Sequence, residues 1–560
     1  MHTQDFDPVS NALGLSSIFA VLPVLALFIL LGGLRLAAQW AALIALGIAM
    51  LVAMIVYGMP VDQTALSATE GAAFGLFPIM WIVVAAIWIY NMTVETGHFA
   101  VLRRSFGAIS NDQRVQAVII AFCFGALLEA LAGFGTPVAI TAVMLIALGF
   151  KPIKAAAVAL VANTAPVAFG AIAIPIVTLS EITGLPKEDL GAMVGRQTPF
   201  LALMVPLILI GMVDGARGIR QAWPVAAIGG LVFAIGQFAC SNYISVELTD
   251  IVASLASTAA IVLLLRVWQP GEPLIAEAAT GRFDRPAVAG SSTHAPAMEA
   301  EVRRRDDTVK DPPGDVLRAY SPYLVIIAVF SIVQIPAVKD ALAEKPWTTT
   351  VQWPGLDVVT PKGEALSSLT YNVNWLPAAG TLLLISGLIT MAILRVTPGR
   401  AVRVAGASLD QLKWAILTVA SVLALAYVMN QAGLTITLGL WAAGAGDFFA
   451  FLSSLIGWMG VAVTGSDTSS NALFGALQVT AANDAGMSPT LLAAANSSGG
   501  VLGKMISPQN LAIGAAAVGM AGQEGDLFRK VLMWSVLLVL VMCVLVYLQS
   551  TAVLDWMVVK

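Results

Sequence analysis

Apolar runs of the length of a membrane span recur along almost the whole chain, and this feature restricts the fold more than any other. A helix needs about 20 mainly apolar residues to cross the hydrocarbon core of a bilayer, and such runs recur from Leu13 to Leu548. Charged residues make up only 11% of the chain, whereas a soluble domain typically carries roughly 25%. Since a helix satisfies its own backbone hydrogen bonds within lipid, we expect an all-α polytopic membrane protein.

Hydropathy and loop charge together predict the path of the chain. The N-terminus is acidic and lacks the basic start of a signal peptide, so the first apolar run is expected to be retained. With the N-terminus outside, the arginine-rich loops fall on the cytoplasmic side, as the positive-inside rule requires. About 12 spans are predicted, at 14–33, 36–57, 72–90, 155–178, 198–213, 222–240, 251–268, 319–337, 374–394, 414–430, 490–521 and 531–549.

The spans divide into two halves. Residues 1–268 form an N-terminal transmembrane half and residues 319–560 a C-terminal half. Between them, 269–318 is rich in Ala, Pro, Gly and charge without apolar periodicity, which predicts a flexible cytoplasmic linker. In the second half, 338–373 carries Trp, Pro and mixed charges and is predicted to be an external loop at the bilayer interface.

Each half also contains an interrupted apolar region. The first, 116–150, is broken around Gly133 and Gly135, and the second, 447–483, is broken at Gly465. The arms of the first region are too short for comfortable crossings, so a re-entrant helical hairpin is predicted in each half. Packing glycines and ordinary helix kinks are the alternative explanation, since both are common in membrane helices.

A second correspondence follows the two hairpins. Asn163 and Asn496 each stand beside a hydroxyl residue near the middle of a long apolar segment. The loop charges place the base of the first hairpin inside and that of the second outside, so the halves are predicted to be inverted repeats. Broken apolar segments at matching places in two halves indicate the substrate site of a transporter.

The residues at these breaks suit an anion and a proton. Helix N-termini present free N–H groups and partial positive charge, and hydroxyls and amides add neutral donors. Glu129 in an apolar arm is the first candidate for proton coupling, because desolvation disfavours its charged form, and Asp467 is the second. Lys504 is expected either to meet a substrate carboxylate or to pair with an acid. The predicted substrate-binding residues are Gly133, Gly135, Thr136, Asn163, Gly465, Ser466, Thr468, Ser469, Asn471, Asn496 and Lys504.

Three stretches carry a resemblance to a known family. They are the run Glu129-Ala130-Leu131-Ala132-Gly133-Phe134-Gly135-Thr136-Pro137, the run Thr464-Gly465-Ser466-Asp467-Thr468-Ser469-Ser470-Asn471, and Lys504 with Ser507-Pro508-Gln509-Asn510. In these, and in length, the chain resembles the bacterial lactate permease family. The resemblance implies proton-coupled symport of L-lactate, D-lactate or glycolate across the bacterial cytoplasmic (inner) membrane. It also implies opposed re-entrant hairpins in the two halves.

Other classes of protein fit the sequence less well. The three histidines are far apart and give no metal spacing, no Gly-x-Ser-x-Gly elbow appears, and the run ending at Gly503-Lys504 lacks the first Gly and the final Ser/Thr of a phosphate loop. We therefore expect no enzyme activity, cofactor or metal, and the small net charge of −4 gives no sign of nucleic-acid binding. A channel and a carrier of another organic anion or a cation remain alternatives. Association into a homo-oligomer is left open.

Overall fold

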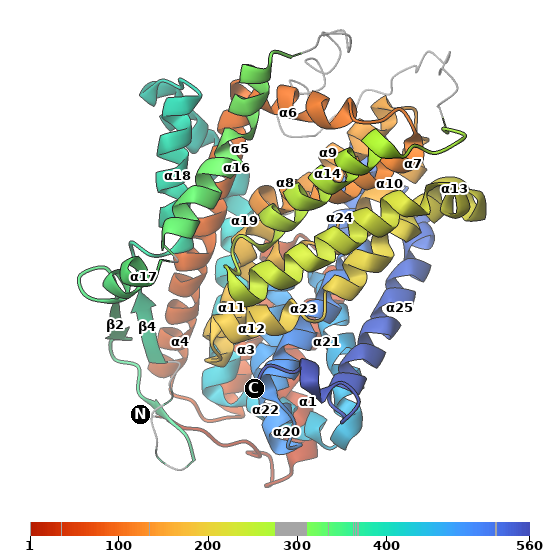
Figure 1. The fold of residues 1–560 in the computed structure, drawn as a ribbon. Helices are drawn as coiled ribbons and strands as arrows, with labels where there is room; N and C mark the ends of the chain where they lie inside the picture. Colours follow the sequence, from red (N-terminus) through yellow and green to blue (C-terminus); the bar gives the residue numbers. More distant parts are fainter. Residues whose placement is uncertain are drawn as a thin grey trace.

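The computed structural model describes residues 2–560 except 35, 134, 275–310, 334, 362, 364–365, 367–368 and 521–522. Figure 1 shows a bundle of tilted helices, with the N-terminus at the end opposite to α6 (His98–Gly107) and α7 (Gln113–Gln116). Among the described residues, ten helical stretches are long and apolar enough to cross a bilayer. The prediction of an all-α multi-pass membrane protein is confirmed.

The first half contains a run of α-helices interrupted by short π- and 3-10-helical segments, here labelled η. Its other elements are α1 (Leu13–Ala20), α2 (Leu22–Phe28), η1 (Ile29–Gly33), α3 (Ala38–Ile55), α4 (Val61–Phe74), η2 (Gly75–Met80), α5 (Trp81–Glu95), η3 (Ala117–Phe124), α8 (Gly125–Ala132), α9 (Thr136–Ala147), α10 (Pro152–Ala162), η4 (Val167–Phe169), α11 (Gly170–Thr183), α12 (Lys187–Val194), α13 (Pro199–Tyr243) and α14 (Thr249–Val267).

The second half repeats this style of construction. Its helices are α16 (Pro313–Val333), α17 (Pro336–Ala343), α18 (Ala379–Ile393), α19 (Pro398–Ala432), α20 (Leu434–Ala443), η6 (Gly446–Phe448), α21 (Phe449–Thr464), α22 (Asp467–Asp484), α23 (Pro489–Gly503), η7 (Lys504–Ile506), α24 (Pro508–Ala517), α25 (Glu524–Gln549) and η8 (Asp555–Met557). Four short strands complete the description: β1 (His2–Thr3), β2 (Thr349–Gln352), β3 (Val358–Val359) and β4 (Thr370–Val373).

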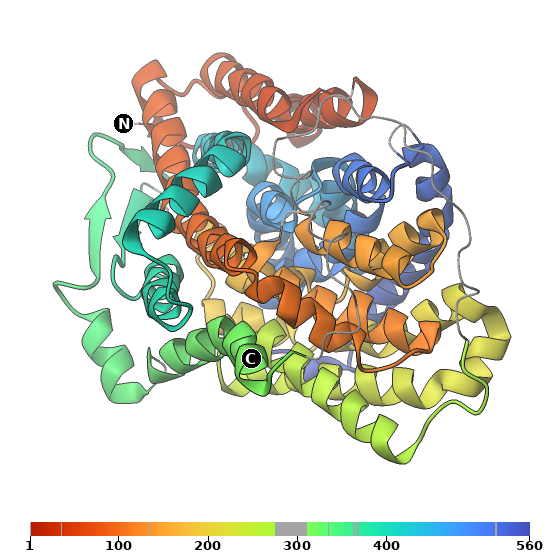
Figure 2. The same cartoon turned by 90° about the horizontal axis from the view of Figure 1, so that it is seen from above.

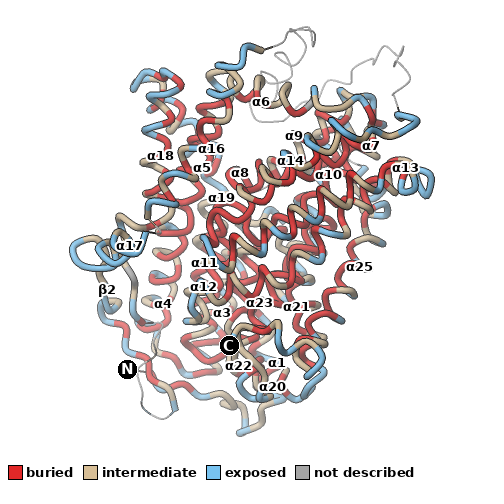
Figure 3. The backbone as a smooth tube through the Cα atoms, viewed as in Figure 1, coloured by how far each residue is buried: buried red, intermediate tan, exposed pale blue. Residues whose placement is uncertain are grey.

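Helices from both halves mix at the centre of the bundle. The helix α9 of the first half packs against α24, and α11 packs against α22 of the second half. Figure 2 shows these orange and blue segments side by side, with α13 in yellow at the edge. Buried residues concentrate in the central helices, while outer helices alternate between buried and exposed positions (Figure 3). The exposed side of an outer helix is apolar, as at Ile55 and Val267, which is what a lipid-facing surface requires.

Of two predicted loops, one is a short turn and the other is helical. The element α13 consists of two helices that meet at a non-helical turn at Asp214 and Gly215, where φ at Gly215 is +59°. The helices lie side by side, because Gly230 packs against the Ala202 carbonyl, so the spans predicted at 198–213 and 222–240 are the two arms of a hairpin. Arg400, Arg403 and Lys413 fall between the spans predicted at 374–394 and 414–430, but they lie within α19. Hydropathy marks where an apolar run ends, and a charged helix continues into water without losing its backbone hydrogen bonds. The start predicted at 414 for the span 414–430 was therefore wrong, because α19 already begins at Pro398.

The predicted external loop 338–373 is partly folded. It contains α17 and three strands, and β2 pairs antiparallel with β4. The chain's own N-terminus joins this region, because β1 pairs in parallel with β3 in the register His2 to Val358. The Gln4 amide then donates to the carbonyl oxygens of Asn430 and Gln431, each at 2.9 Å. Strands of two to four residues are too short to give a period in the sequence.

Most of the predicted linker 269–318 lies outside the described residues, so its flexibility stays a prediction. Its C-terminal boundary differs from the prediction, because α16 already begins at Pro313. At its other end, the described residues hold the base of the first hairpin: Gln113 N–H donates to the Leu274 carbonyl at 2.9 Å, and Leu274 N–H donates to Asp112 Oδ2 at 3.2 Å.

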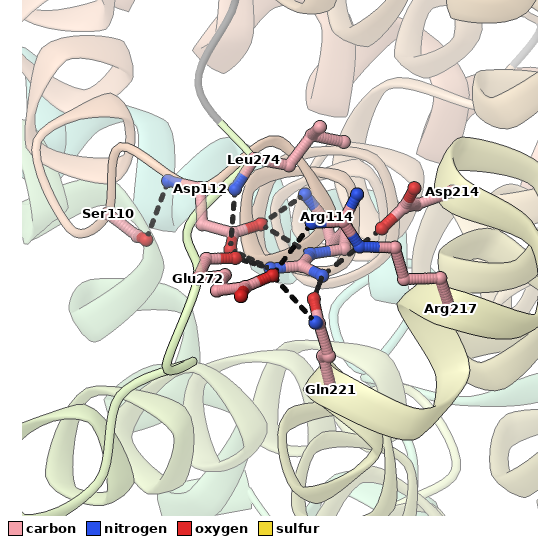
Figure 4. Close-up of polar contacts among 8 residues, drawn as sticks. All are labelled: Ser110, Asp112, Arg114, Asp214, Arg217, Gln221, Glu272 and Leu274. Atoms are coloured by element: carbon pink, nitrogen blue, oxygen red, sulfur yellow. Dashed lines mark hydrogen bonds and ion pairs between the residues drawn. The ribbon is translucent and has the colours of Figure 1, made fainter.

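A buried arginine lies at the centre of this contact. Arg114 is 0% exposed, and its guanidinium pairs with Asp112 Oδ2 at 2.6 Å and with Asp214 Oδ2 at 3.2 Å. It also donates to Gln221 Oε1 and to the Glu272 carbonyl, both at 2.6 Å (Figure 4). The cluster ties the start of the first hairpin to the break in α13 and to the chain that follows α14.

Candidate functional site

The first hairpin turns between α8 and α9 at two glycines in unusual conformations. Gly133 has φ +21° and Gly135 has φ +82°, a region that L side chains rarely adopt. A Cβ on Gly135 would lie 2.5 Å from Ile513 Cδ1 and 3.3 Å from Asn510 Oδ1. Glycine therefore lets the tip approach α24 of the other half.

The second hairpin turns at Gly465, with φ +76°. Ser466 caps α22, since its hydroxyl accepts the Ser469 N–H at 3.2 Å. The tip also meets α24, because the Asn510 side chain donates to the Gly465 carbonyl at 3.3 Å and a Cβ on Gly465 would lie 2.7 Å from Gln509 Oε1. Both hairpin tips thus converge on the first turns of one helix.

A broken helix follows each hairpin. In the first half, α10 and the segment 167–183 meet at a bend of 64°, and Ala171, Ile172 and Ala173 then have φ of 45°, 58° and 57°. A left-handed turn costs non-glycine residues roughly 1–2 kcal/mol each, and strain of this kind clusters at functional sites. In the second half, α23 ends at Gly503, and the short helix η7 separates it from α24, which begins at Pro508.

The two halves interlock through equivalent elements. The helix α9 packs on α10 of its own half and on α24 of the other, while α22 packs on α23 of its own half and on α11 of the other. Such an exchange is what two related halves produce. The inverted relation of these halves stays a prediction.

A buried ion pair joins the halves at these breaks. Lys504 Nζ lies 2.6 Å from Glu129 Oε1, and the two residues are 6% and 2% exposed. The Asn163 amide donates to Glu129 Oε2 at 2.9 Å. A Cβ on Gly170 would lie 2.8 Å from Glu129 Oε1, so a side chain at this position would displace the carboxylate. Lys504 was expected either to contact a substrate carboxylate or to pair with an acid. In the structure it pairs with the acid Glu129.

Asp467 lies in a neighbouring polar recess at the start of α22. It is 3% exposed, and its Oδ2 accepts the Ser497 hydroxyl at 2.5 Å. Its Oδ1 has no hydrogen-bond partner among the described residues, and Gly500 packs directly against this oxygen. One buried carboxylate oxygen is therefore left for a proton or a ligand to satisfy.

A cavity of about 1140 Å³ brings these groups to one surface. Glu129, Lys504 and Asp467 line it, together with both hairpin tips, the left-handed turn and the start of α24. Residues at the starts of α3 and α25, such as Gln39 and Phe528, also contribute to its wall. The volume is above the 300–1,000 Å³ typical of a small-molecule pocket, so the cavity has room for a small ligand and for water beside it.

Comparison with known proteins decides the family. A sequence profile described as L-lactate permease matches residues 16–553. The chain belongs to the L-lactate permease family. It is therefore a transporter and not an enzyme.

Curated relatives of this permease match it over almost their whole length. The L-lactate permeases of Bacillus subtilis (strain 168) and Escherichia coli (strain K12) are each 41% identical, over 99% of this chain and of theirs. The glycolate permease of Escherichia coli (strain K12) is 40% identical over 98% of each chain. Among solved structures, the YdaH transporter of Alcanivorax borkumensis has a TM-score of 0.42 at 13% identity, covering 86% of each chain. MtrF of Neisseria gonorrhoeae has a TM-score of 0.45 at 13% identity, covering 86% and 83%.

The predicted site residues of the permease divide into two groups. Those that line the cavity are Gly133, Gly465, Ser466, Thr468, Ser469 and Lys504, with the proton candidates Glu129 and Asp467. The others lie behind the wall: Gly135 and Thr136 in the first tip, Asn163 on Glu129, and Asn471 and Asn496 in a buried amide chain. In that chain Asn496 donates to Asn471 Oδ1 at 2.8 Å, and Asn471 donates to the Pro175 carbonyl at 3.0 Å.

Sequence reasoning overlooked several residues of the site. Gln509 and Gly170 line the cavity, and the run Phe169-Gly170 to Pro175 carried a signal, since Gly and Pro inside an apolar segment mark a break. Asp250 does not line the cavity, but it was overlooked in the same way: it stands just before the span predicted at 251–268, yet it lies in the first turn of α14 and is 0% exposed. Trp414 and Thr418 also line the cavity, and nothing in their neighbourhood distinguished them from lipid-facing residues.

Proposed function

We propose that this permease carries small 2-hydroxy monocarboxylates, namely L-lactate, D-lactate and glycolate, together with protons across the bacterial cytoplasmic membrane. Relatives that are 40–41% identical over nearly their whole length are named L-lactate and glycolate permeases. Lactate and glycolate share a carboxylate with a hydroxyl on the next carbon. A single binding mode that uses both groups would serve all three substrates.

The Glu129–Lys504 pair is the observation that supports proton coupling. The pair is net neutral and lines the cavity. A proton on Glu129 removes its negative charge and leaves the ammonium of Lys504 for the carboxylate of the substrate. The loaded site, with one proton and one anion added, is again neutral. Because an uncompensated charge inside a membrane protein costs several kcal/mol, the anion alone and the proton alone are both disfavoured.

Neutral donors complete the proposed substrate site. The hydroxyls of Ser466, Thr468 and Ser469 lie at the N-terminus of α22, on the cavity wall. This end of the helix carries partial positive charge, which favours an anion. Asp467 in the same turn opposes that effect when it is ionised, so it is the second candidate for carrying a proton.

The residues that line the cavity indicate from which side of the membrane the proposed site is reached. The starts of α3 and α25 line the cavity, and Arg529 and Lys530 in the first turns of α25 place that end on the cytoplasmic side by the positive-inside rule. On this basis the molecule is in an inward-facing state. The amide chain from Asn496 through Asn471 ends on the carbonyl of Pro175, which lines the cavity.

Transport in reconstituted vesicles tests the proposal. Glu129→Gln keeps the volume of the side chain and removes its titration, so proton-driven lactate accumulation should fall at least tenfold relative to lactate exchange measured in the same vesicles. Lys504→Gln should weaken lactate affinity by roughly tenfold to a hundredfold, since charge-assisted hydrogen bonds contribute about 1.5–3 kcal/mol. An unchanged accumulation ratio in Glu129→Gln at normal expression would exclude Glu129 as the proton carrier.

Substrate choice needs a separate measurement. Competition for labelled L-lactate uptake by D-lactate, glycolate, pyruvate and succinate ranks the contributions of the hydroxyl and of a second carboxylate. We expect D-lactate and glycolate to compete and succinate to fail, because Lys504 offers one positive charge for one carboxylate. Effective competition by succinate alone would point to a dicarboxylate carrier.

A further inference from the structure

One fully buried carboxyl has no place in the site described so far. Asp250 lies in the first turn of α14 and is 0% exposed. The described residues that line the cavity do not include it. Its Oδ2 finds no hydrogen-bond partner in the part of the chain that the structure describes. A carboxyl removed from water in this way needs a partner or a proton.

The other oxygen of Asp250 is connected through Gln237 to the segment that carries Asn163, the hydrogen-bond partner of Glu129. Gln237 Nε2 approaches Asp250 Oδ1 at 3.4 Å and donates to the carbonyl of Ala165 at 3.2 Å. Ala165 stands two residues after Asn163 in the broken helix of the first half, and the Asn163 amide holds Glu129. Gln237 is itself fully buried and accepts the Thr198 hydroxyl at 3.1 Å. Asp250 is thus connected to the back of the ion-pair site.

The charged neighbours of Asp250 favour a neutral acid. The helix α14 packs against α13, α8 and η3. From α8, the Glu129 carboxylate acts on Asp250 as a like charge. The titratable neighbours from α13 and η3 are the thiols of Cys240 and Cys123. In the loop before α14, Glu247 pairs with Lys187 at 2.5 Å, so this lysine is already engaged with another acid.

We propose that Asp250 is a second proton-binding carboxyl of this transporter, on the outer side of the Glu129–Lys504 pair. The position follows from α14, which starts in the predicted external loop and ends beside Arg266 on the cytoplasmic side. The inference rests on the proton coupling proposed above. An ionised Glu129 favours a proton on Asp250 by repulsion, and protonation of Glu129 removes that repulsion. A proton taken up at Asp250 moves to Glu129 as the substrate anion binds Lys504, and a second proton from the outer side returns Asp250 to its neutral form, so that each anion enters the site with one proton.

The substitution Asp250→Asn tests this role, since asparagine is close in volume and keeps an acceptor for Gln237. The measurement is the ratio of proton-driven lactate accumulation to lactate exchange in vesicles, followed as a function of outer pH. We expect the ratio to fall at least tenfold and its pH dependence to flatten. Glu247→Gln, which removes an acid three residues away, is the matched control and should keep the pH profile of the parent. A parent-like ratio and pH profile in Asp250→Asn overturns the inference.

A second variant tests the role of Asp250 without replacing it, so that the test does not depend on the folding of Asp250→Asn. Gln237→Leu leaves Asp250 in place but removes the hydrogen-bond donor of its ionised form, so the midpoint of the pH profile should move to higher pH. An unmoved midpoint counts against Asp250. Infrared difference spectra of the parent protein should also show a carboxylic acid band that grows as the pH falls and is missing in Asp250→Asn. A spectrum without such a band overturns the inference.

The outcome for Glu129 separates this inference from the proposed function. If Glu129→Gln loses accumulation while Asp250→Asn behaves like the parent, proton coupling through Glu129 stands and Asp250 is only a structural acid. If the parent itself accumulates lactate without any dependence on a proton gradient, both proposals fail together.

Discussion

Removing one member of the Glu129–Lys504 pair should destabilise the protein more than removing both. The two charged atoms lie 2.6 Å apart, and each side chain is more than nine-tenths buried. Lys504→Met keeps an unbranched stem but leaves the Glu129 carboxylate with only the Asn163 amide at 2.9 Å. Breaking a buried pair in this way costs about 3–5 kcal/mol, whereas replacing both charges by neutral groups is often nearly neutral. The double variant Glu129→Gln/Lys504→Met should therefore lose less than the sum of the single losses, by about 3 kcal/mol.

Equilibrium unfolding of purified protein in mixed micelles with increasing dodecyl sulfate measures these free energies. The exposed pair of Arg400 and Glu95 is a matched control: its atoms lie 3.1 Å apart, but its side chains are 41% and 46% exposed. The coupling energy of that pair should be about 0–1 kcal/mol. If the Glu129 and Lys504 losses add within about 0.5 kcal/mol, the two charges do not depend on each other. The charge balance proposed for proton coupling would then have no physical basis.

Three further outcomes follow from other contacts. Arg114→Gln leaves the buried Asp112 and the partly buried Asp214 without their cation, so the free energy of unfolding in the same assay should fall by about 3–5 kcal/mol; a loss under 1 kcal/mol contradicts the described cluster. Gly500→Ala places a Cβ against Asp467 Oδ1, and proton-driven lactate uptake should fall at least tenfold at normal expression, while parent-like uptake shows that Asp467 tolerates displacement. Burial of Glu247 disfavours its charged form, but the ion pair with Lys187 outweighs this and lowers the pKa of that carboxyl. The charge-assisted hydrogen bond of the Glu247 carboxylate contributes about 1.5–3 kcal/mol to the free energy of unfolding. This contribution is fully present above roughly pH 4.3, the pKa of a glutamate in the unfolded chain, and it is lost as the pH falls through the lower pKa of the folded protein. Glu247→Gln should remove this part of the pH dependence of stability.

The sequence predicted those features that depend on local chemistry. Long apolar runs located most of the membrane helices, since lipid requires backbone hydrogen bonds to be satisfied within each segment. The glycines at 133, 135 and 465 marked the hairpin turns, because only glycine readily takes a positive φ at a close helix approach. Glu129 and Lys504 were noticed as charges inside apolar segments, which are rare unless they are functional.

Features that depend on long-range contacts could not be predicted in this way. Glu129 and Lys504 are 375 positions apart, so nothing local could show that they pair. The left-handed turn at Ala171–Ala173 has no glycine within it, so its residue types gave no sign of a positive φ. Asp250 resembled a loop residue because the apolar run begins after it, and its burial comes from α13 and α8. Strands β1 and β3 pair across most of the chain length.

The division of the site between the two halves has a consequence for coupled transport. Glu129 comes from the first half and Lys504 comes from the second, so each half holds only one member of the ion pair. Any movement of one half relative to the other that opens this interface must separate the Glu129 carboxylate from the Lys504 ammonium. Separating two buried charges is costly, unless a proton has already neutralised Glu129 and a substrate carboxylate has taken its place beside Lys504. If the ion pair binds lactate and a proton as proposed, it would also resist this movement when only one of them is present, and such resistance would prevent leakage of protons.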